Sequence, residues 1–412
     1  MHDFKYRGNN FYCENVSVDS LAKRFGTPLY VYSYKTFIDH FLKLKSAFSP
    51  ISPLICYSIK ANSNLTILKA LVNKGAGLDI VSGGELLRAL KVGCPAKKIV
   101  YASVGKTDIE ITTAIKKGIL FFNVESLAEL KNINRISAKL RKITRVAMRL
   151  NPDVEASTHK YITTGKITNK FGIDLDNAYK ILLLRDKFKY LNICGLHIHI
   201  GSQITASAPF VAAIKKVSDF IQLLKNKRVN LEYLNIGGGL GIIYDNETPQ
   251  TAAIYANQII PLLERTGLKI IMEPGRFIVG NSGILVARVL YIKYTPQKKF
   301  IIVDAGMNDL IRPALYSAYH NILPLRRNLK TEKADLVGPI CESGDFLAKE
   351  RLIPKVKEGD YLAVMGAGAY GFSMSSNYNS RPRPAEVMVV GKNVSLIRKR
   401  ESFKDLIRNE KA

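Results

Sequence analysis

The stretch Leu54-Ile55-Cys56-Tyr57-Ser58-Ile59-Lys60-Ala61-Asn62 decides how the chain folds. Residues 54–59 form an apolar run that is typical of a fully buried strand, and a lysine follows directly. Parallel sheets carry their reactive groups at the carboxyl ends of the strands, so Lys60 is placed to do chemistry. A lysine at a strand end can also simply extend its charged head into water. The residues further along the chain decide between these interpretations.

Similar apolar runs, rich in β-branched residues, recur along the chain. They lie at residues 77–81, 99–103, 120–124, 145–150, 193–200, 233–236 and 269–272. Helical patterns lie between them, and several end at a capping glycine. Strand and helix alternate eight times, which predicts an α/β fold with a parallel (β/α)8 TIM-type barrel over residues 33–282. An open doubly wound sheet alternates in the same way, but eight units in one run favour closure.

The pattern changes from about Gly283 onward. Strand-like runs follow one another without intervening amphipathic helices, at residues 284–291, 300–303, 361–364 and 386–390. This predicts a second, mostly antiparallel β domain made of residues 283–412 together with residues 1–32, where the run 28–32 also resembles a strand. A short amphipathic turn at residues 403–407 indicates a solvated terminal helix.

The chain is strongly basic. Its 412 residues include 61 Lys and Arg against 34 Asp and Glu, a formal charge of +27, which raises nucleic acid, a membrane surface or an anionic ligand as partners. The charge is spread along the whole chain, without a basic arm interleaved with aromatic residues and without zinc-finger spacing. We therefore interpret it as a solvated surface and expect no nucleic-acid partner.

The compartment is predicted from the cysteines and the apolar runs. The five cysteines are odd in number and contain no CxxC pair, which fits a reducing compartment without structural disulfides. Residues 1–5 do not open a signal peptide, and no apolar run reaches the roughly 18 residues of a membrane helix. We expect a soluble, cytoplasmic protein without a membrane partner.

Polar residues stand at the expected carboxyl end of every barrel strand, where barrels have their active sites. In chain order these are Lys60, residues 79–84, Ser103, Asn123, Glu125, Arg149, Asn151, residues 197–202, the glycine-rich stretch 237–241, and residues 273–276. The purely structural face of a barrel would not need this density of polar groups. We therefore predict that these strand ends form one site.

The two histidines of His197-Ile198-His199 have period-two spacing, so both rings point to the same side of their strand. A zinc pair is one use of such spacing. The other four histidines, however, do not lie at strand ends, so no further ligands complete a metal set, and we expect no metal. Stacking on an aromatic cofactor is the better use for His199, and a satisfied core histidine fits His197 well.

Two further features complete the pattern. The glycines at residues 237–241 follow the seventh strand, where barrels bind phosphate through backbone N–H groups, although a glycine-rich turn alone is weak support. Glu273 can pair with Arg276, or it can face a pyridine nitrogen and keep it protonated. A lysine for an imine, a phosphate loop, a stacking ring and an acidic partner together indicate a pyridoxal phosphate site.

These residues resemble the diaminopimelate decarboxylase family, which belongs with the ornithine decarboxylase and alanine racemase-like pyridoxal phosphate enzymes. The similarity covers roughly residues 5–395. The matching segments are 57–62, 78–86, 159–172, 195–203, 237–241, 273–276, 341–345 and 368–381, with a looser match at 101–105. The resemblance implies a homodimer with shared active sites, in which Cys341 and Glu342 reach the partner's cofactor.

The resemblance also implies roles for individual residues. The catalytic residues would be Lys60, His199 and Cys341, with Cys341 as the acid that protonates the carbanion. A cysteine buried as a small hydrophobe is the alternative for Cys341. The cofactor would be bound by Lys60, His199, Ser202, Gly239, Glu273, Pro274, Gly275, Arg276 and Tyr370. The substrate would be bound by Arg276, Arg312, Tyr316, Glu342 and Tyr370.

The expected activity is decarboxylation of meso-2,6-diaminopimelate to L-lysine and CO2 through a pyridoxal phosphate imine, the last step of lysine biosynthesis. Arginines suit the second carboxylate of this small-molecule substrate, and ornithine has none. On composition alone, Arg312 could be merely a surface charge. The alternatives are a decarboxylase of the same fold acting on another basic amino acid or a carboxylated polyamine, and a non-catalytic pyridoxal phosphate-binding protein.

Overall fold

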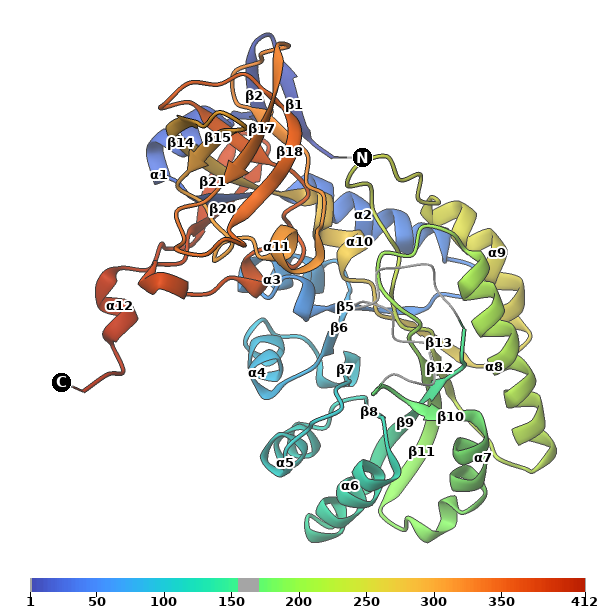
Figure 1. Ribbon diagram of the computed structural model, residues 1–412. Helices are drawn as coiled ribbons and strands as arrows, with labels where there is room; N and C mark the ends of the chain where they lie inside the picture. Colours follow the sequence, from blue (N-terminus) through green and yellow to red (C-terminus); the bar gives the residue numbers. More distant parts are fainter. Residues whose placement is uncertain (1, 155–169, 412) are drawn as a thin grey trace. The chain divides into compact units, whose positions relative to one another are not determined.

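The computed structural model describes residues 2–154 and 170–411, and it divides into two compact units (Figure 1). The barrel unit comprises Phe41–Gly241 and Thr248–Phe277, and the β unit comprises Met1–His40, Ile242–Glu247 and Ile278–Ala412. The segment 159–172, which carries part of the family resemblance, lies outside the described residues up to residue 169.

The barrel unit is a closed parallel barrel, which confirms the predicted fold class. Its strands are β5 (Leu54–Ser58), β6 (Gly77–Ile80), β7 (Ile99–Tyr101), β8 (Phe121–Val124), β9 (Thr144–Asn151), β11 (Leu191–Ile198), β12 (Tyr233–Asn235) and β13 (Lys269–Met272). Neighbours pair in this order, β8 pairs with β9, and β13 pairs back to β5. The two-residue strand β10 (Ile173–Asp174) adds to β9.

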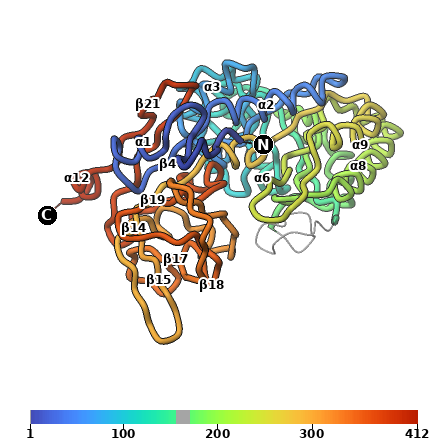
Figure 2. Tube along the Cα trace, turned by 90° about the horizontal axis from the view of Figure 1, so that it is seen from above, coloured from blue at the N-terminus to red at the C-terminus, as the bar shows by residue number. Residues whose placement is uncertain are grey.

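Helices alternate with the barrel strands along the chain. They are α2 (Tyr34–Ala47), α3 (Leu65–Asn73), α4 (Gly83–Lys91), α5 (Asp108–Lys117), α6 (Leu127–Lys139), α7 (Leu175–Leu183), α8 (Ala208–Asn226) and α9 (Ala252–Glu264). Side chains of Ser82, Thr107 and Ser126 accept a backbone N–H at the start of α4, α5 and α6, which satisfies donors that the helices cannot. Helices α8 and α9 lie side by side (Figure 2).

The β unit holds two sheets. The larger runs in the order β18-β17-β15-β14-β4-β20-β21, with β19 pairing both β14 and β16. Its strands are β4 (Leu29–Ser33), β14 (Gly283–Tyr294), β15 (Lys299–Val303), β16 (Ile322–Pro324), β17 (Thr331–Val337), β18 (Phe346–Pro354), β19 (Tyr361–Val364), β20 (Ala385–Val390) and β21 (Asn393–Arg398). Most pairings are antiparallel, as predicted, while β4–β20 and β15–β17 are parallel.

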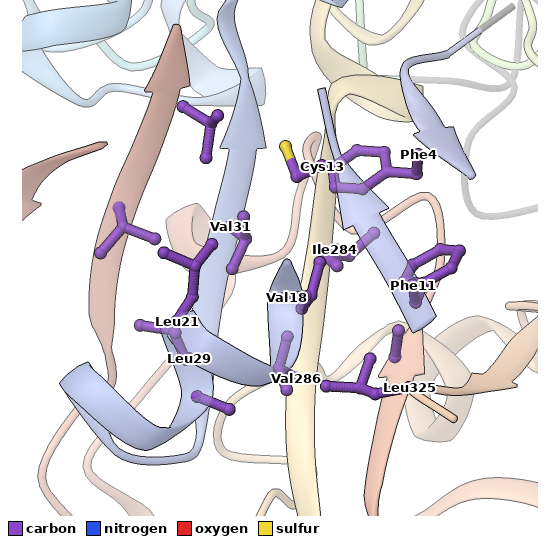
Figure 3. Packing of buried hydrophobic residues seen from close by; sticks show 14 of the residues in the cluster. Phe4, Phe11, Cys13, Val18, Leu21, Leu29, Val31, Ile284, Val286 and Leu325 are labelled. Carbon is purple, nitrogen blue, oxygen red and sulfur yellow. The ribbon is translucent and has the colours of Figure 1, made fainter. Parts of the chain in front are cut away.

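The N-terminal segment adds the small sheet β1 (Phe4–Arg7), β2 (Asn10–Cys13) and β3 (Val16–Ser17), followed by helix α1 (Val18–Phe25). A buried apolar cluster joins this segment to the large sheet (Figure 3). The cluster includes Phe11 of β2, Val31 of β4, and Ile284 and Val286 of β14. The strand expected at residues 28–32 is β4 (Leu29–Ser33), which pairs with β14 and β20 of the large sheet.

The predicted terminal helix is present as α12 (Phe403–Ile407). Among residues 2–154 and 170–411, no helix combines the length and the apolar character that crossing a membrane requires.

Removing a large side chain from the barrel core should destabilise the protein. Phe121 is 1% exposed and its ring meets Tyr233 edge-on at 5.6 Å. We expect Phe121→Ala to lower the free energy of unfolding by about 3–5 kcal/mol, because it leaves a cavity. Ile109→Ala, at a side chain that is 80% exposed, is the control and should change it by less than about 0.5 kcal/mol. Equal thermal unfolding midpoints for the two variants would contradict this packing.

Candidate active site

Lys60 lies directly after β5, in a single 3-10 turn formed by Ile59–Ala61. Its side chain is 37% exposed, and its Nζ lies 3.8 Å from Oδ2 of Asp79, whose side chain is fully buried at β6. Ser58 Oγ donates a hydrogen bond of 2.6 Å to the same Asp79 oxygen. The strand end therefore presents an accessible amine, which imine formation requires, and Asp79 fixes its position.

The carboxyl ends of β13 and β5 are joined by a backbone contact. The N–H of Ser58 donates to the carbonyl of Pro274 at 3.1 Å. Gly275 lies so close that a Cβ on it would come within 3.1 Å of the Cβ atoms of Ser58 and Ala61. This approach brings Glu273 to the same end of the barrel as Lys60.

The carboxylate of Glu273 is held by two asparagine amides. Nδ2 of Asn123 donates to Oε1 at 3.0 Å, and Nδ2 of Asn235 donates to the same oxygen at 2.6 Å. Oδ1 of Asn235 accepts the N–H of Gly237 at 3.0 Å, which fixes which end of that amide faces Glu273. Because both amides donate, the carboxylate is held as an acceptor.

His197 belongs to this cluster. Its Nε2 lies 3.2 Å from Oε2 of Glu273, and both side chains are buried. His197 is thus a core histidine, as the sequence suggested, and it also contacts a predicted site carboxylate. Burial would raise the pKa of Glu273, but His197, Lys60 and Asn235 outweigh burial and leave that pKa well below its usual range. Glu273 is thus favoured as an anion, and it can accept a hydrogen bond from a protonated ring nitrogen.

Asp79 behaves in the opposite way. Burial first, and then the charge of Glu273, raise the pKa of Asp79, while Lys60 and Ser58 offset part of the effect. Oδ1 of Asp79 and Oδ1 of Asn123 are buried without a hydrogen-bond partner among the described residues. Such atoms are rare in folded proteins, and here both belong to side chains that contact the site, Asp79 beside Lys60 and Asn123 beside Glu273.

His199 follows β11 (Leu191–Ile198), and its ring is partly exposed. Its Nδ1 accepts the N–H of Gly238 at 3.2 Å, so the neutral tautomer carries its proton on Nε2. Burial, followed by the charges of Lys60 and Arg149, lowers the pKa of His199 well below its usual value. A neutral imidazole fixed in this way is suited to stack on a pyridine ring.

The glycine-rich segment follows β12 (Tyr233–Asn235) and packs against neighbouring backbone. A Cβ on Gly237, Gly238 or Gly239 would come within 2.4 Å of Ile198 O, 2.2 Å of Glu273 O or 2.6 Å of Gly201 O, so only glycine fits. Gly237 and Gly239 also have φ of +66° and +112°. Within this turn, the N–H groups of Gly237 and Gly238 are donated to Oδ1 of Asn235 and Nδ1 of His199, which fixes the backbone that leads to Gly239.

Arg276 lies beside this segment at the start of the short helix α10 (Arg276–Val279), and its Nη2 donates to Ser202 Oγ at 3.1 Å. The barrel unit therefore brings together the predicted Lys60, His199 and Glu273 with Ser202 and Arg276. These groups fit pyridoxal phosphate: an amine, a neutral ring, an anionic carboxylate and donors for a phosphate.

The β unit carries the predicted substrate residues Arg312 and Tyr316, on helix α11 (Arg312–Tyr316). Arg312 is 6% exposed, so its interpretation as a surface charge is wrong. Its Nη1 lies 2.8 Å from Nε2 of His320. Tyr316 is partly exposed.

Cys341 is exposed, whereas the other four cysteines are buried, so the alternative of a small buried hydrophobe is wrong for this residue. Its N–H donates to Oδ1 of Asn379 at 2.7 Å. The next residue, Glu342, is also exposed, and Tyr378 Oη lies 3.5 Å from its Oε2. This loop therefore presents a thiol and a carboxylate at the surface of its own unit.

Asp345 ends the segment Cys341-Glu342-Ser343-Gly344-Asp345 and holds its loop in place. Its two carboxylate oxygens accept the N–H groups of Met307 and Ile340 at 2.6 and 2.7 Å. Asp345 thus anchors the loop that carries Cys341. Tyr370, the last predicted contact of this unit, has a left-handed backbone with φ of +58°, a strained conformation for a residue with a Cβ.

The sequence prediction missed Asn235, and it gave Asn123 a place at a strand end without a role. Both asparagines are 0% exposed, and each lies among apolar residues of a barrel strand. A buried amide needs hydrogen-bond partners, so an asparagine inside such a strand is a signal for a polar neighbour.

Comparison with known proteins identifies the family of the chain. Residues 34–280 match the family described as pyridoxal-dependent decarboxylase, pyridoxal binding domain. The diaminopimelate decarboxylase of Aquifex aeolicus (strain VF5) is 51% identical over 401 residues, which is 97% of this chain and 95% of that protein.

Two solved structures are similar over nearly their whole length. Diaminopimelate decarboxylase from Helicobacter pylori, complexed with L-lysine, is 42% identical with a TM-score of 0.92, covering 95% of this chain and 99% of that chain. The enzyme from M. jannaschii, in co-complex with L-lysine, is 38% identical with a TM-score of 0.95, covering 100% and 99%. With Lys60, His199 and Glu273 gathered at one end of a closed barrel, the chain belongs to the diaminopimelate decarboxylases, which use pyridoxal 5'-phosphate.

Proposed function

We propose that this chain decarboxylates meso-2,6-diaminopimelate to L-lysine and CO2, the last step of lysine biosynthesis. The observation that carries the proposal is the end of the barrel, which holds Lys60 beside Asp79 and a Glu273 carboxylate that two amides hold as an acceptor. The relatives bearing this name support the choice of substrate, and the L-lysine in two of their structures supports the product.

In this proposal the barrel residues bind the cofactor. Lys60 binds its aldehyde carbon, Glu273 accepts the N–H of its ring nitrogen, and neutral His199 stacks on its face. The phosphate is bound by Ser202, Gly239 and Tyr370, with the backbone of Glu273, Pro274, Gly275 and Arg276. Bound pyridoxal phosphate supplies an electron sink for the pair that remains when a carboxylate leaves as CO2.

The proton that replaces the carboxylate comes from Cys341 in this proposal. The thiol and Glu342 are exposed on their own unit, which supports the proposal that they act at the cofactor of the other subunit in a homodimer. Glu342 then binds the distal ammonium of the substrate. The five free thiols fit a protein working in the reducing cytoplasm.

The distal end of the substrate determines specificity. Diaminopimelate carries a second carboxylate, for which arginine offers a planar pair of donors. We assign this carboxylate to Arg276 and Arg312, with Tyr316 and Tyr370 as further contacts. The burial of Arg312 supports a specific role for its charge.

The proposed function is tested by offering the purified protein, with pyridoxal phosphate, meso-diaminopimelate, ornithine, arginine and L-lysine in turn. We expect CO2 release from diaminopimelate alone, with L-lysine as the product, and none from a Lys60→Ala control. CO2 release from another amino acid instead would show that the substrate, and the roles given to Arg312 and Glu342, are assigned wrongly. If none of the four releases CO2 while the visible absorbance of lysine-bound cofactor is present, the result would favour a non-catalytic binding protein.

Replacing one amide behind Glu273 should weaken the cofactor site. Asn235→Asp exchanges a donor for a second carboxylate next to Glu273, which removes a hydrogen bond to a charged group. We expect pyridoxal phosphate to bind on the order of 10–100-fold more weakly, as measured by titrating the visible absorbance. Asn192→Asp, at an exposed position of β11, makes the same charge change and should bind as the wild type does. Equal affinities would argue against this role for Asn235.

Replacing the exposed thiol should affect turnover and spare the cofactor. We expect Cys341→Ala to lower kcat by about 10²–10⁴, the usual contribution of a general acid, while the visible absorbance of bound cofactor is retained. Ser343→Ala, two residues away on the same loop, is the matched control and should keep kcat. An unchanged kcat in Cys341→Ala would remove the thiol from the proposed reaction.

A further inference from the structure

Arg312 opens helix α11 (Arg312–Tyr316), and its guanidinium is held by His320, eight residues further along, and by Tyr244 from a separate segment of the β unit. Its Nη1 lies 2.8 Å from Nε2 of His320, and both residues are buried. Its Cζ lies 4.5 Å from the centre of the Tyr244 ring, within the range of a cation–π contact. The guanidinium is therefore restrained both at one edge and across its face.

The hydrogen bonds of His320 determine its tautomer. Nδ1 lies 2.8 Å from the carbonyl oxygen of Met365, which can only accept, so Nδ1 carries the proton. Nε2 faces an Arg312 nitrogen that can only donate, so Nε2 is a lone pair. The imidazole is therefore neutral, and it holds the guanidinium without cancelling its positive charge, which a carboxylate in the same place would do.

Tyr244 is held as firmly. Its ring meets the His320 ring edge-on, with centroids 5.3 Å apart at 75°, so the same ring contacts both members of the pair. Gly366 lies against it, and a Cβ at that glycine would come within 3.2 Å of the Tyr244 ring. The N–H of Tyr244 donates to Glu247 Oε2 at 2.9 Å, which fixes the backbone turn that carries the ring.

We propose that His320 and Tyr244 are positioning residues that fix the direction in which Arg312 presents its guanidinium, and that they thereby set selectivity for a substrate with a second carboxylate. This inference rests on the proposed function, in which Arg312 binds that carboxylate. An arginine side chain is flexible, and a two-point grip on a carboxylate demands one geometry. Restraint of the guanidinium before binding lowers the entropy that binding must remove.

The key variants separate loss of position from loss of fold. His320→Leu removes the acceptor, whereas His320→Gln keeps an acceptor oxygen. Tyr244→Leu removes the aromatic face, whereas Tyr244→Phe keeps it. Arg312→Ala, alone and combined with His320→Leu, shows whether histidine acts through the arginine.

Two measurements are made on the holoenzyme. The first is kcat and KM for meso-diaminopimelate. The second is competitive inhibition by L-lysine, which retains the distal carboxylate, and by cadaverine, which lacks it. The difference between the two inhibition constants reports how tightly the distal carboxylate is bound, independently of the chemical step.

If the inference holds, His320→Leu and Tyr244→Leu raise KM and the inhibition constant of L-lysine about tenfold or more, while kcat and inhibition by cadaverine stay within about twofold. His320→Gln and Tyr244→Phe stay close to the wild type. The double variant is no weaker than Arg312→Ala, because the histidine acts through the arginine.

The failures are distinguishable. If Arg312→Ala raises KM and His320→Leu and Tyr244→Leu do not, the positioning role is overturned and the proposed function stands. If Arg312→Ala leaves KM and L-lysine inhibition unchanged, the assignment of the distal carboxylate falls, and the inference falls with it. Additive losses in the double variant, or equal losses for L-lysine and cadaverine, would show general damage to the unit and also overturn the inference.

Discussion

The site depends on the seam at which the barrel closes. Strand β13 pairs with β5 through only two residue pairs, Ile271 with Leu54 and Met272 with Ile55, and the N–H of Ser58 then continues the contact to the carbonyl of Pro274. The hydroxyl of Ser58 also lies 3.1 Å from the carbonyl oxygen of Glu273, 215 residues away in the chain. This seam places the lysine that ends one strand beside the carboxylate that ends another. An open sheet with the same order of strands would leave the two at opposite edges, so closure of the barrel is what makes the site possible.

Two buried carboxyl groups, Glu273 and Asp79, lie at this end of the barrel, and their surroundings shift their pKa values in opposite directions. Glu273 faces two amide donors and an imidazole, which favour its anion, whereas burial and the charge of Glu273 raise the pKa of Asp79. Like charges in one low-dielectric site cannot both be stabilised without donors, so the hydrogen bonds decide which group stays ionised. The outcome matches the proposed chemistry, in which a permanent anion faces the ring nitrogen while the carboxyl beside Lys60 can hold a proton.

The barrel could be predicted from the sequence because its strands are buried on both faces and therefore form continuous apolar runs. The same rule fails for β17 and β18, which the sequence did not indicate. These strands expose polar residues such as Lys333 in β17 and Glu350 in β18, so their pattern resembles a loop. At the site, Lys60, His199 and Glu273 were predictable because each ends a strand. Tyr244 was not, because its segment, Ile242–Glu247, packs in the β unit although its neighbours in the chain belong to the barrel unit. His320 was dismissed as a candidate because it ends no strand, and only the fold brings it to Arg312.

A neutral imidazole holds the arginine that the proposal assigns to the distal carboxylate. Nε2 of His320 accepts a hydrogen bond from Nη1 of Arg312, whose other N–H groups can face an anion. A carboxylate could orient this donor equally well, but it would also lower the positive potential that an incoming anion meets. A hydroxyl would leave the potential unchanged, but its rotating proton fixes the direction less firmly. A neutral imidazole with its other nitrogen protonated supplies one fixed lone pair and no net charge. Where an anion must be bound tightly and in one orientation, this is the acceptor that gives direction to the donor without weakening its attraction for the ligand.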